Sequence, residues 1–210
     1  MPQMPSLFRV DPHHPDPVLI AQAAEKIRAG LVVAYPTDTL YGLAVDPRNG
    51  DAVRRLFALK GRPESSALTL IAADVEQARD VAEMSANAAR LVERFWPGPL
   101  TIVMAATAVV APETLAGGRT VGVRVPDHAV ARALARAAGF CITATSANRS
   151  GQPPAATAED VARSLPDVDA IVDGGASRGG APSTIVDASL TEIALIRDGA
   201  VPWDRVIKFR

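Results

Sequence analysis

Apolar and polar residues follow a pattern along this chain that predicts helices separated by short strands. Over residues 18–29 the apolar positions recur three and four residues apart, which is the spacing of a helix with one buried face. Gly30 comes next, and glycine commonly ends a helix because it adopts left-handed backbone angles without strain. Similar patterns predict further helices over residues 51–59, 75–82, 86–95, 129–138 and 158–165.

Short apolar runs between these helices are typical of buried strands, and the first of them covers residues 31–35. Further strands are expected at residues 68–72, 100–105, 120–125, 141–144, 170–172, 183–186 and 192–196. Because helices and strands alternate over most of the chain, the pattern predicts an α/β fold with a twisted, largely parallel or mixed open sheet covered by helices. The last three strands have little helix between them and suggest antiparallel additions.

Length and turn residues indicate one domain. A chain of 210 residues can bury a single core unaided, and neither an internal repeat nor a long linker divides it. Residues 1–17 are rich in proline and polar side chains, so we expect an irregular leader followed by a single domain over residues 18–210. Residues 107–119 contain one proline and two glycines and are expected to form a surface loop.

Composition narrows the class of protein. The chain has 22 Lys and Arg against 23 Asp and Glu, a net charge of −1, so weak or no direct nucleic-acid binding is expected. The one cysteine, Cys141, cannot form an internal disulfide and lies in an apolar run typical of a buried strand. A secretory signal and a bilayer-spanning apolar stretch are both missing from the sequence, which predicts a cytoplasmic protein without membrane contact.

Four polar clusters follow hydrophobic segments and carry the candidate chemistry. They are residues 36–43 (PTDTLYGL), 60–63 (KGRP), 146–151 (SANRSG) and 183–187 (STIVD). Substrates collect at the carboxyl ends of strands in open α/β folds, so these clusters are expected to form one dispersed site.

The first cluster offers hydroxyl groups for a small polar substrate, and Gly42 permits close approach of the backbone. The alternative is a turn that ends a strand, in which Asp38 caps local amides. In the second cluster, Lys60 and Arg62 suit phosphate binding, because the chain has no glycine-rich phosphate loop. Considered alone, these two cations are more typical of solvated side chains at the end of a helix, where the helix dipole favours positive charge.

Two arginines lie in or at the end of apolar runs, Arg124 in one predicted strand and Arg197 at the end of another. An arginine that is partly buried needs a partner, because an unpaired buried charge is costly. That partner is either a substrate carboxylate or an internal one, for which Asp187 and Asp198 are available. No histidine spacing marks a metal site, and no nucleophile with a paired base is recognisable, which favours positioning and charge neutralisation over covalent catalysis.

Taken in combination and order, these motifs resemble the YrdC-like threonylcarbamoyl-AMP synthases in their single-domain form. The resemblance covers residues 18–197 and rests on PTDTxYGL, KxRP, PGPxT, VRxP, SANxSG and STxVD. It implies a YrdC-like fold that makes threonylcarbamoyl-AMP and pyrophosphate from L-threonine, bicarbonate and ATP, with Mg²⁺ accompanying the ATP. The product serves N6-threonylcarbamoyladenosine formation in tRNA, which a separate transferase usually completes.

The resemblance also implies roles for individual residues. Lys60 and Arg62 would be the catalytic cations, and no protein side chain is assigned to the metal. The L-threonine contacts would be Thr39, Arg124, Ala144 and Ser183. The ATP contacts would be Lys60, Arg62, Ser66, Thr120, Ser146, Asn148, Pro154 and Arg197. Two positions depart from the family pattern: Ser66 replaces the usual asparagine, and Ile71 stands where many members carry histidine.

Two other functions remain open from the sequence. One is a non-catalytic YrdC-like paralogue that acts as an RNA-binding module, and the other is the carbamoyl-transfer domain of hydrogenase maturation. The presence of both basic residues of KxR and of both polar residues of SxN favours an active synthase. Hydrogenase-maturation domains normally occur in longer chains with cysteine-rich modules, which this sequence lacks.

Overall fold

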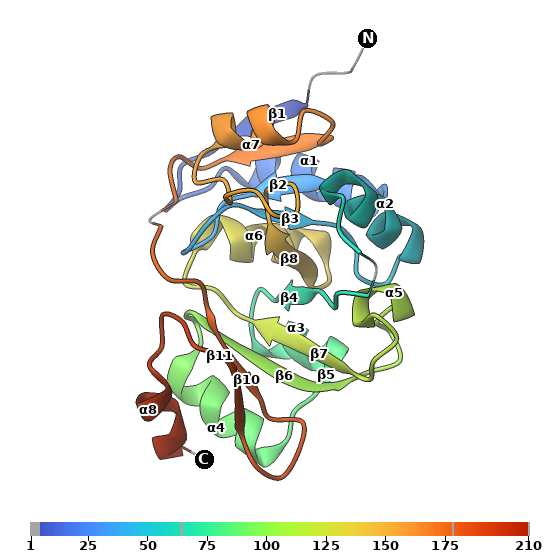
Figure 1. Cartoon of the computed structure of the whole chain (residues 1–210). Coiled ribbons are helices and arrows are strands. Elements are labelled where there is room, and N and C mark those ends of the chain that lie inside the picture. Colours follow the sequence, from blue (N-terminus) through green and yellow to red (C-terminus); the bar gives the residue numbers. More distant parts are fainter. Residues whose placement is uncertain (1–4, 64, 178, 210) are drawn as a thin grey trace.

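Eleven strands of the described chain form one mixed sheet that helices cover (Figure 1). The computed structural model describes residues 5–63, 65–177 and 179–209. The strands are β1 (Ser6–Arg9), β2 (Val33–Tyr35), β3 (Gly42–Ala44), β4 (Thr69–Ile71), β5 (Ala82–Glu83), β6 (Leu100–Ala106), β7 (Thr120–Arg124), β8 (Ile142–Ser146), β9 (Ala170–Asp173), β10 (Thr184–Asp187) and β11 (Ala194–Arg197). The helices are α1 (Pro17–Arg28), α2 (Gly50–Lys60), α3 (Val75–Val81), α4 (Ala86–Phe95), α5 (Pro112–Leu115), α6 (Ala129–Ala138), α7 (Ala158–Ser164) and α8 (Trp203–Val206), followed by the 3₁₀ turn η1 (Ile207–Phe209).

The sheet order is β1-β9-β2-β3-β8-β4-β7-β6-β10-β11, with β5 paired to β6. Strand β8 joins a first half-sheet (β1, β9, β2, β3) to a second half-sheet (β4, β7, β6, β10, β11). Within the described residues, the parallel pairs are β1–β9, β2–β9, β4–β7 and β6–β10, and the remaining pairs are antiparallel. The prediction of a mixed sheet is confirmed, but a largely parallel sheet is wrong, because β3 and β8 both run antiparallel to their neighbours.

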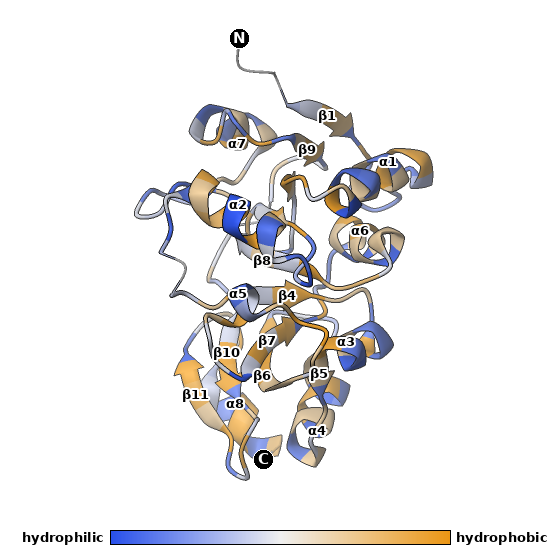
Figure 2. Cartoon of the chain, turned by 90° about the vertical axis from the view of Figure 1, so that its right-hand side faces the viewer, coloured by the Kyte–Doolittle hydropathy of each residue, from blue (hydrophilic) through white to orange (hydrophobic). Residues whose placement is uncertain are grey.

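Helices pack on both faces of the first half-sheet and on one face of the second. Helices α1 and α6 pack in one hydrophobic cluster with β2 and β9, and α2 and α7 belong to another. Helices α3, α4 and α8 pack against β4, β6, β7 and β10. Figure 2 shows the strands of the second half-sheet in hydrophobic colours and hydrophilic residues along α1, α2 and α3.

Local capping explains where α2 begins and ends. Asn49 precedes it, and its side-chain oxygen accepts hydrogen bonds from the backbone amides of Asp51 (3.1 Å) and Ala52 (3.2 Å). Gly61 follows the helix with a φ of 58°, a left-handed angle that favours glycine and reverses the chain. This reversal sends Arg62 into the cavity described below.

Three short elements differ from the expectations drawn from the sequence. Residues 6–9, expected within an irregular leader, form β1 and pair in parallel with β9. Residues 42–44, taken as part of a loop, form β3. Residues 107–119 are not simply a surface loop, because they include α5, in which Thr114 is fully buried and its hydroxyl donates to the carbonyl of Pro47 (2.8 Å). Such short elements carry too few residues to show a hydrophobic period.

Candidate active site

A cavity of about 320 Å³ lies between the loop after β2 and the second half-sheet. Residues of all four polar clusters line it, together with Arg124 from the end of β7. Strand β8 contributes residues 144–146, and the segment between β9 and β10 contributes residues 182 and 183. These separate motifs therefore meet at one cavity, as the sequence predicts.

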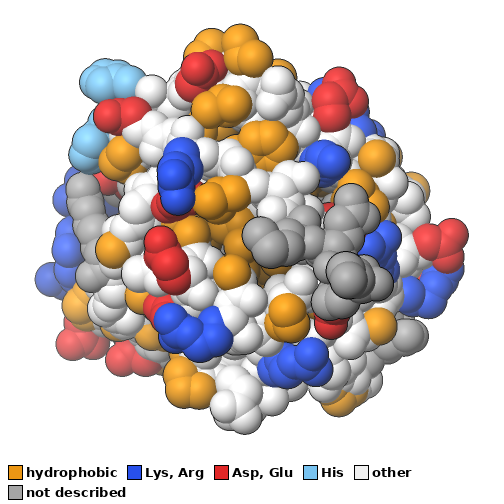
Figure 3. Space-filling model, turned by 90° about the horizontal axis from the view of Figure 1, so that it is seen from above, with side chains coloured by type: hydrophobic (Ala, Val, Ile, Leu, Met, Phe, Trp, Pro, Cys, Tyr) orange, Lys and Arg blue, Asp and Glu red, His pale blue; other side chains and the backbone are white. Residues whose placement is uncertain are grey.

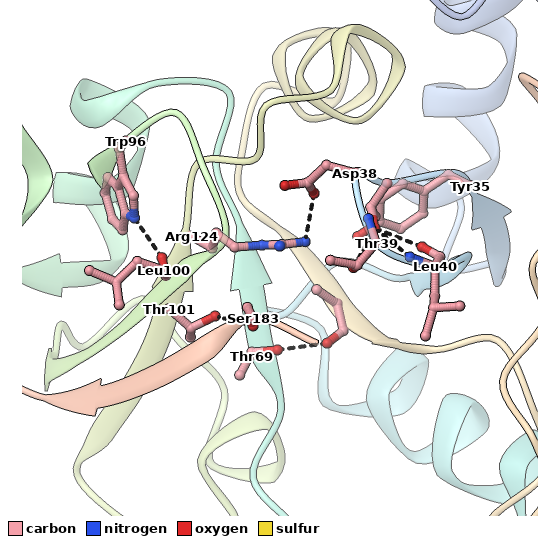
Figure 4. A network of polar contacts seen from close by, with 12 residues as sticks. Tyr35, Asp38, Thr39, Leu40, Thr69, Trp96, Leu100, Thr101, Arg124 and Ser183 are labelled. Atoms are coloured by element: carbon pink, nitrogen blue, oxygen red, sulfur yellow. Dashed lines mark hydrogen bonds and ion pairs between the residues drawn. The ribbon is translucent and has the colours of Figure 1, made fainter. Parts of the chain in front are cut away.

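Side chains on one face of the second half-sheet form one wall of this cavity. Leu100 and Ile102 are fully buried in the core, whereas Thr101 between them lines the cavity. Successive side chains of a strand point to opposite faces, and Thr69 of β4 lines the same wall. The hydroxyl oxygens of Thr101 and Ser183 lie 2.9 Å apart (Figure 4). Thr69 and Thr101 were missed from the sequence; the available signal was a single threonine within an apolar strand.

The loop after β2 is organised by Thr37. The Thr37 hydroxyl accepts hydrogen bonds from the backbone amides of Thr39 and Leu40, both at 3.2 Å, and donates to the carbonyl of Leu40 at 2.7 Å (Figure 4). Asp38 makes none of these bonds, so the alternative in which Asp38 caps this turn is wrong. The turn leaves Thr39 and Leu40 facing the cavity.

Gly42 serves packing as well as access. A Cβ atom at Gly42 would lie 3.3 Å from the ring of Tyr35, so a larger residue would press on that ring. Tyr35 is fully buried, its hydroxyl donates to the carbonyl of Thr143 at 2.9 Å, and burial raises the pKa of its phenol. Glycine thus lets β3 pack directly against Tyr35 at the edge of the cavity.

Arg124 pairs with Asp38 and not with either of the internal partners considered from the sequence. Arg124 Nη2 lies 3.2 Å from Asp38 Oδ1, and the two side chains are only 8% and 10% exposed (Figure 4). In every other ion pair of the described chain the cation is at least 36% exposed. Arg124 Nη1 and Asp38 Oδ1 have no hydrogen-bond partner among the described residues, so the contact is ionic without hydrogen-bond geometry.

Lys60 is only 3% exposed and is bound to the loop after β8. Its ammonium group donates to the carbonyl oxygens of Ser146 and Asn148, the latter at 2.9 Å, and to the side-chain oxygen of Asn148 at 3.4 Å. Asn148 in turn donates from its side-chain amide to the carbonyl of Gln152 at 2.5 Å. Burial, and next the charge of Arg62, lower the pKa of Lys60 to about 8. Lys60 and Asn148 therefore shape the loop from behind, while Ser146 lines the cavity.

Arg62 and Arg197 line the cavity without a carboxylate partner among the described residues. Arg62 donates to the hydroxyl of Thr145 at 2.9 Å, and Arg197 donates to the carbonyl of Ser183 at 2.7 Å. Burial lowers the pKa of both guanidinium groups, and the charge of Arg124 lowers that of Arg197 further. Positive charge without a protein anion predicts an anionic ligand.

Most of the residues predicted to bind L-threonine or ATP line this cavity. The four assigned to L-threonine (Thr39, Arg124, Ala144 and Ser183) all line it, as do Arg62, Ser146 and Arg197 of the ATP set. Lys60 and Asn148 lie behind the lining. Ser66, Thr120, Pro154 and Ile71 are not among the described residues that line it.

Position in the fold explains two of these exclusions. Thr120 begins β7 and pairs with Ala105, so it lies at the end of the strand opposite Arg124, ~13 Å away at ~3.3 Å per residue. Ile71 pairs with Arg124 across β4 and β7 and is fully buried in the core.

Clustered metal ligands and membrane-spanning helices are both absent from the described part of the chain. It contains no group of three or more His, Cys, Asp or Glu side chains that could hold a metal ion. None of its helices is both long enough and apolar enough to span a membrane.

The chain is similar to known proteins over most of its length. The Sua5_yciO_yrdC family model, described as "Telomere recombination", matches residues 25–199. The threonylcarbamoyl-AMP synthase of Bacillus subtilis is 40% identical over 190 residues, which cover 89% of this chain and 55% of that protein. The threonylcarbamoyl-AMP synthase of Halorhodospira halophila is 47% identical over 161 residues, which cover 75% of this chain and 84% of that protein.

A solved structure also superimposes on most of the chain. The crystal structure of Pyrococcus abyssi Sua5 complexed with L-threonine matches with a TM-score of 0.91 and 37% sequence identity. The match covers 97% of this chain and 60% of that one. The chain thus spans less than two thirds of the length of the Bacillus and Pyrococcus relatives, and most of the length of the Halorhodospira relative.

Proposed function

The chain belongs to the Sua5/YciO/YrdC family, and from that membership and the cavity we propose that it is an L-threonylcarbamoyladenylate synthase. The reaction would join L-threonine, bicarbonate and ATP into threonylcarbamoyl-AMP and release pyrophosphate. The observation that carries the proposal is the lining of one cavity by Arg62, Arg124 and Arg197 together with hydroxyl groups from several strands. Such a cavity suits a ligand with both phosphate and carboxylate groups.

The triphosphate would lie toward Arg62 and Arg197, which have no carboxylate partner among the described residues. Guanidinium groups bind phosphate oxygens through two parallel hydrogen bonds, and burial strengthens such contacts. Lys60 would support this end of the site by holding the loop that presents Ser146. The relatives named threonylcarbamoyl-AMP synthase support an AMP-containing product, for which ATP would be the adenylate donor.

The amino acid would lie toward Arg124, Thr39 and Ser183. A crystallised Pyrococcus relative binds L-threonine, and the residues here that would contact threonine line the same cavity. Arg124 would bind the carboxylate, and the nearby hydroxyl groups would bind the amine and side-chain hydroxyl. This end shares the cavity with the phosphate end, so both substrates would meet within reach of each other.

The chemistry follows from that arrangement. The uncharged amine of threonine would add to carbon dioxide derived from bicarbonate, forming a C–N bond and a carbamate after loss of a proton. A carbamate oxygen would then attack the α-phosphorus, and the bond to the pyrophosphate oxygen would break. Arg62 would offset negative charge that builds on the transferring and leaving oxygens. Mg²⁺ would enter with ATP and neutralise phosphate charge.

Pyrophosphate release tests the proposal directly. Purified protein is incubated with MgATP, with and without L-threonine and with and without bicarbonate. We expect release only when both are present, and the product would be passed to a tRNA threonylcarbamoyl transferase. Release that ignores threonine or bicarbonate, or no release from folded protein, would contradict the synthase assignment.

The same sample distinguishes the RNA-binding alternative. Lys, Arg, Asp and Glu side chains are interspersed on the face seen in Figure 3, which gives no uniform basic surface there. A protein without pyrophosphate release that binds tRNA with a steep salt dependence would instead be the RNA-binding paralogue.

A further inference from the structure

Asp38 lies beside a cavity with an excess of positive charge. Four cations line this cavity or lie directly behind its lining: Lys60, Arg62, Arg124 and Arg197. Among the described residues, Asp38 is the one carboxylate within 4.0 Å of any of these cations. Asp38 is therefore the carboxylate placed to offset this positive charge when no substrate is bound.

The contact between Asp38 and Arg124 is costly for an ion pair. Both side chains are at least nine-tenths buried, and Asp38 Oδ1 and Arg124 Nη1 have no hydrogen-bond partner among the described residues. Removing two charges from water is compensated only when good geometry and further hydrogen bonds accompany their attraction. Because Arg124 Nη1 has no hydrogen-bond acceptor among the described residues, it can donate to a substrate carboxylate.

Neighbouring charges make a counterion necessary. Arg197 lies close enough for the charge of Arg124 to lower its pKa, so the two guanidinium groups repel each other. Asp38 comes from the loop after β2 and Arg124 from the end of β7, and Figure 4 shows the two side chains meeting between these elements. The pair therefore joins the two sides of the cavity.

We propose that Asp38 is the internal counterion of Arg124 in the empty cavity, and that the carboxylate of the amino-acid substrate takes over this role. This inference rests on the proposed function, because that function supplies an amino acid as the ligand. Asp38 acts through Arg124 and is a positioning residue. It stabilises the empty protein, and its negative charge lowers the affinity for a substrate carboxylate.

Asp38→Asn tests both consequences, because it keeps the size of the side chain and removes its charge. Thermal unfolding is measured with no ligand, with L-threonine and with L-threoninamide, in which the carboxylate is replaced by a neutral amide. Without ligand we expect the unfolding temperature to fall by about 10 °C, because a buried guanidinium loses its counterion. We expect the affinity for L-threonine to rise about tenfold and that for L-threoninamide to stay unchanged.

Asp169→Asn is the matched control. Asp169 also pairs with an arginine, Arg55, at 2.6 Å, and it accepts a hydrogen bond from the backbone amide of Val32. Arg55 does not line the cavity, whereas Arg124 does. This variant should lose stability and keep the wild-type affinity for both ligands. A purely structural role for Asp38 would give the same result, so the difference between the two ligands is the decisive measurement.

The double variant Asp38→Asn/Arg124→Met keeps the test decisive if the single variant does not fold. Removing both charges should restore most of the lost stability, since a buried ion pair can be replaced by neutral residues at little cost. A double variant no more stable than Asp38→Asn, or an unchanged or lower affinity of Asp38→Asn for L-threonine, would overturn the counterion role. Failure of the wild-type protein to bind L-threonine at all would instead refute the proposed function.

Discussion

The ammonium nitrogen of Lys60 lies 2.9 Å from the carbonyl oxygen of Asn148, so the end of α2 is bound to the loop after β8. Two further contacts to the same loop use the remaining hydrogen-bond donors of this ammonium group. Lys60 therefore supports the loop, whereas Arg62 faces the cavity itself. The two cations of one motif have different structural roles.

Alanine variants should separate these roles. Lys60→Ala and Arg62→Ala should both reduce pyrophosphate release by about a hundredfold or more. Arg62→Ala removes a charge that faces the transferring phosphate, and Lys60→Ala removes the support of the loop that presents Ser146. Only Lys60→Ala should also speed amide hydrogen exchange in residues 146–150, since Arg62 makes no hydrogen bond to that loop beyond the Thr145 hydroxyl. Unchanged exchange in Lys60→Ala, or wild-type turnover in either variant, would contradict these assignments.

The binding of ATP should depend on pH through Lys60. Burial and the charge of Arg62 lower the pKa of Lys60 to about 8, so the ammonium is charged below that pH and loses its proton above it. A bound triphosphate favours the charged form, and we expect affinity to be full below pH 8 and to fall as the pH rises through that value. Calorimetry with a non-hydrolysable ATP analogue from about pH 7 to about pH 9.5 measures this change.

Two observations check the assignment to Lys60. In Lys60→Arg the guanidinium stays protonated over this range, so any affinity that remains should not fall with pH. Stability should change in the opposite sense, because the unfolded chain keeps its proton up to the ordinary pKa of 10.5 whereas the folded chain releases it at about 8. Between these two pH values the unfolded state binds more protons than the folded state. The titration of Lys60 therefore raises the free energy of unfolding as the pH rises.

Elements were predictable where a segment is long enough to show its hydrophobic period. Helices α4 and α6 have the bounds expected from the sequence, because ten residues show a complete apolar face. Strands β1 and β3 were missed, since β1 lies in a segment rich in proline and polar residues and β3 follows a polar turn interpreted as part of a longer loop. Strands β9 and β8, to which they pair, are distant in the sequence. The direction of β8 also depends on tertiary pairing, which explains why the sequence did not distinguish a largely parallel sheet from a mixed one.

The site was predictable as a set of motifs but not as a network of contacts. Polar clusters after apolar segments identified the residues that meet in the cavity. The partner of Arg124 was not predictable, because Asp38 is distant in the sequence and belongs to a turn that could have used it locally. Likewise, nothing in the sequence distinguishes Lys60 behind the loop from Arg62 in the cavity, since that depends on how α2 ends.

Arg124→Lys should raise the L-threonine concentration needed for half-maximal activity by about tenfold or more. Lysine keeps the charge but loses the planar group that can bind a carboxylate through two hydrogen bonds. The half-saturating concentration of ATP should change little, because Arg62 and Arg197 form the phosphate end. Steady-state pyrophosphate release at varied threonine and at varied ATP separates these effects, and an unaltered threonine dependence would count against a carboxylate contact.

Gly122→Ala should disturb the threonine end of the cavity from beneath. A Cβ atom at Gly122 would lie 3.1 Å from the methyl of Thr69 and 3.2 Å from the methyl of Thr101, both on strands that flank β7. Because these methyls are held on the cavity wall, we expect a stability loss of ~1–3 kcal/mol by chemical denaturation. The half-saturating concentration of L-threonine should also rise, since Thr101 contacts Ser183.

Thr69→Ser removes one of the two crowded methyls and keeps the hydroxyl, so adding it to Gly122→Ala should recover part of both losses. A double variant as impaired as Gly122→Ala would show that crowding at Thr69 is not the cause.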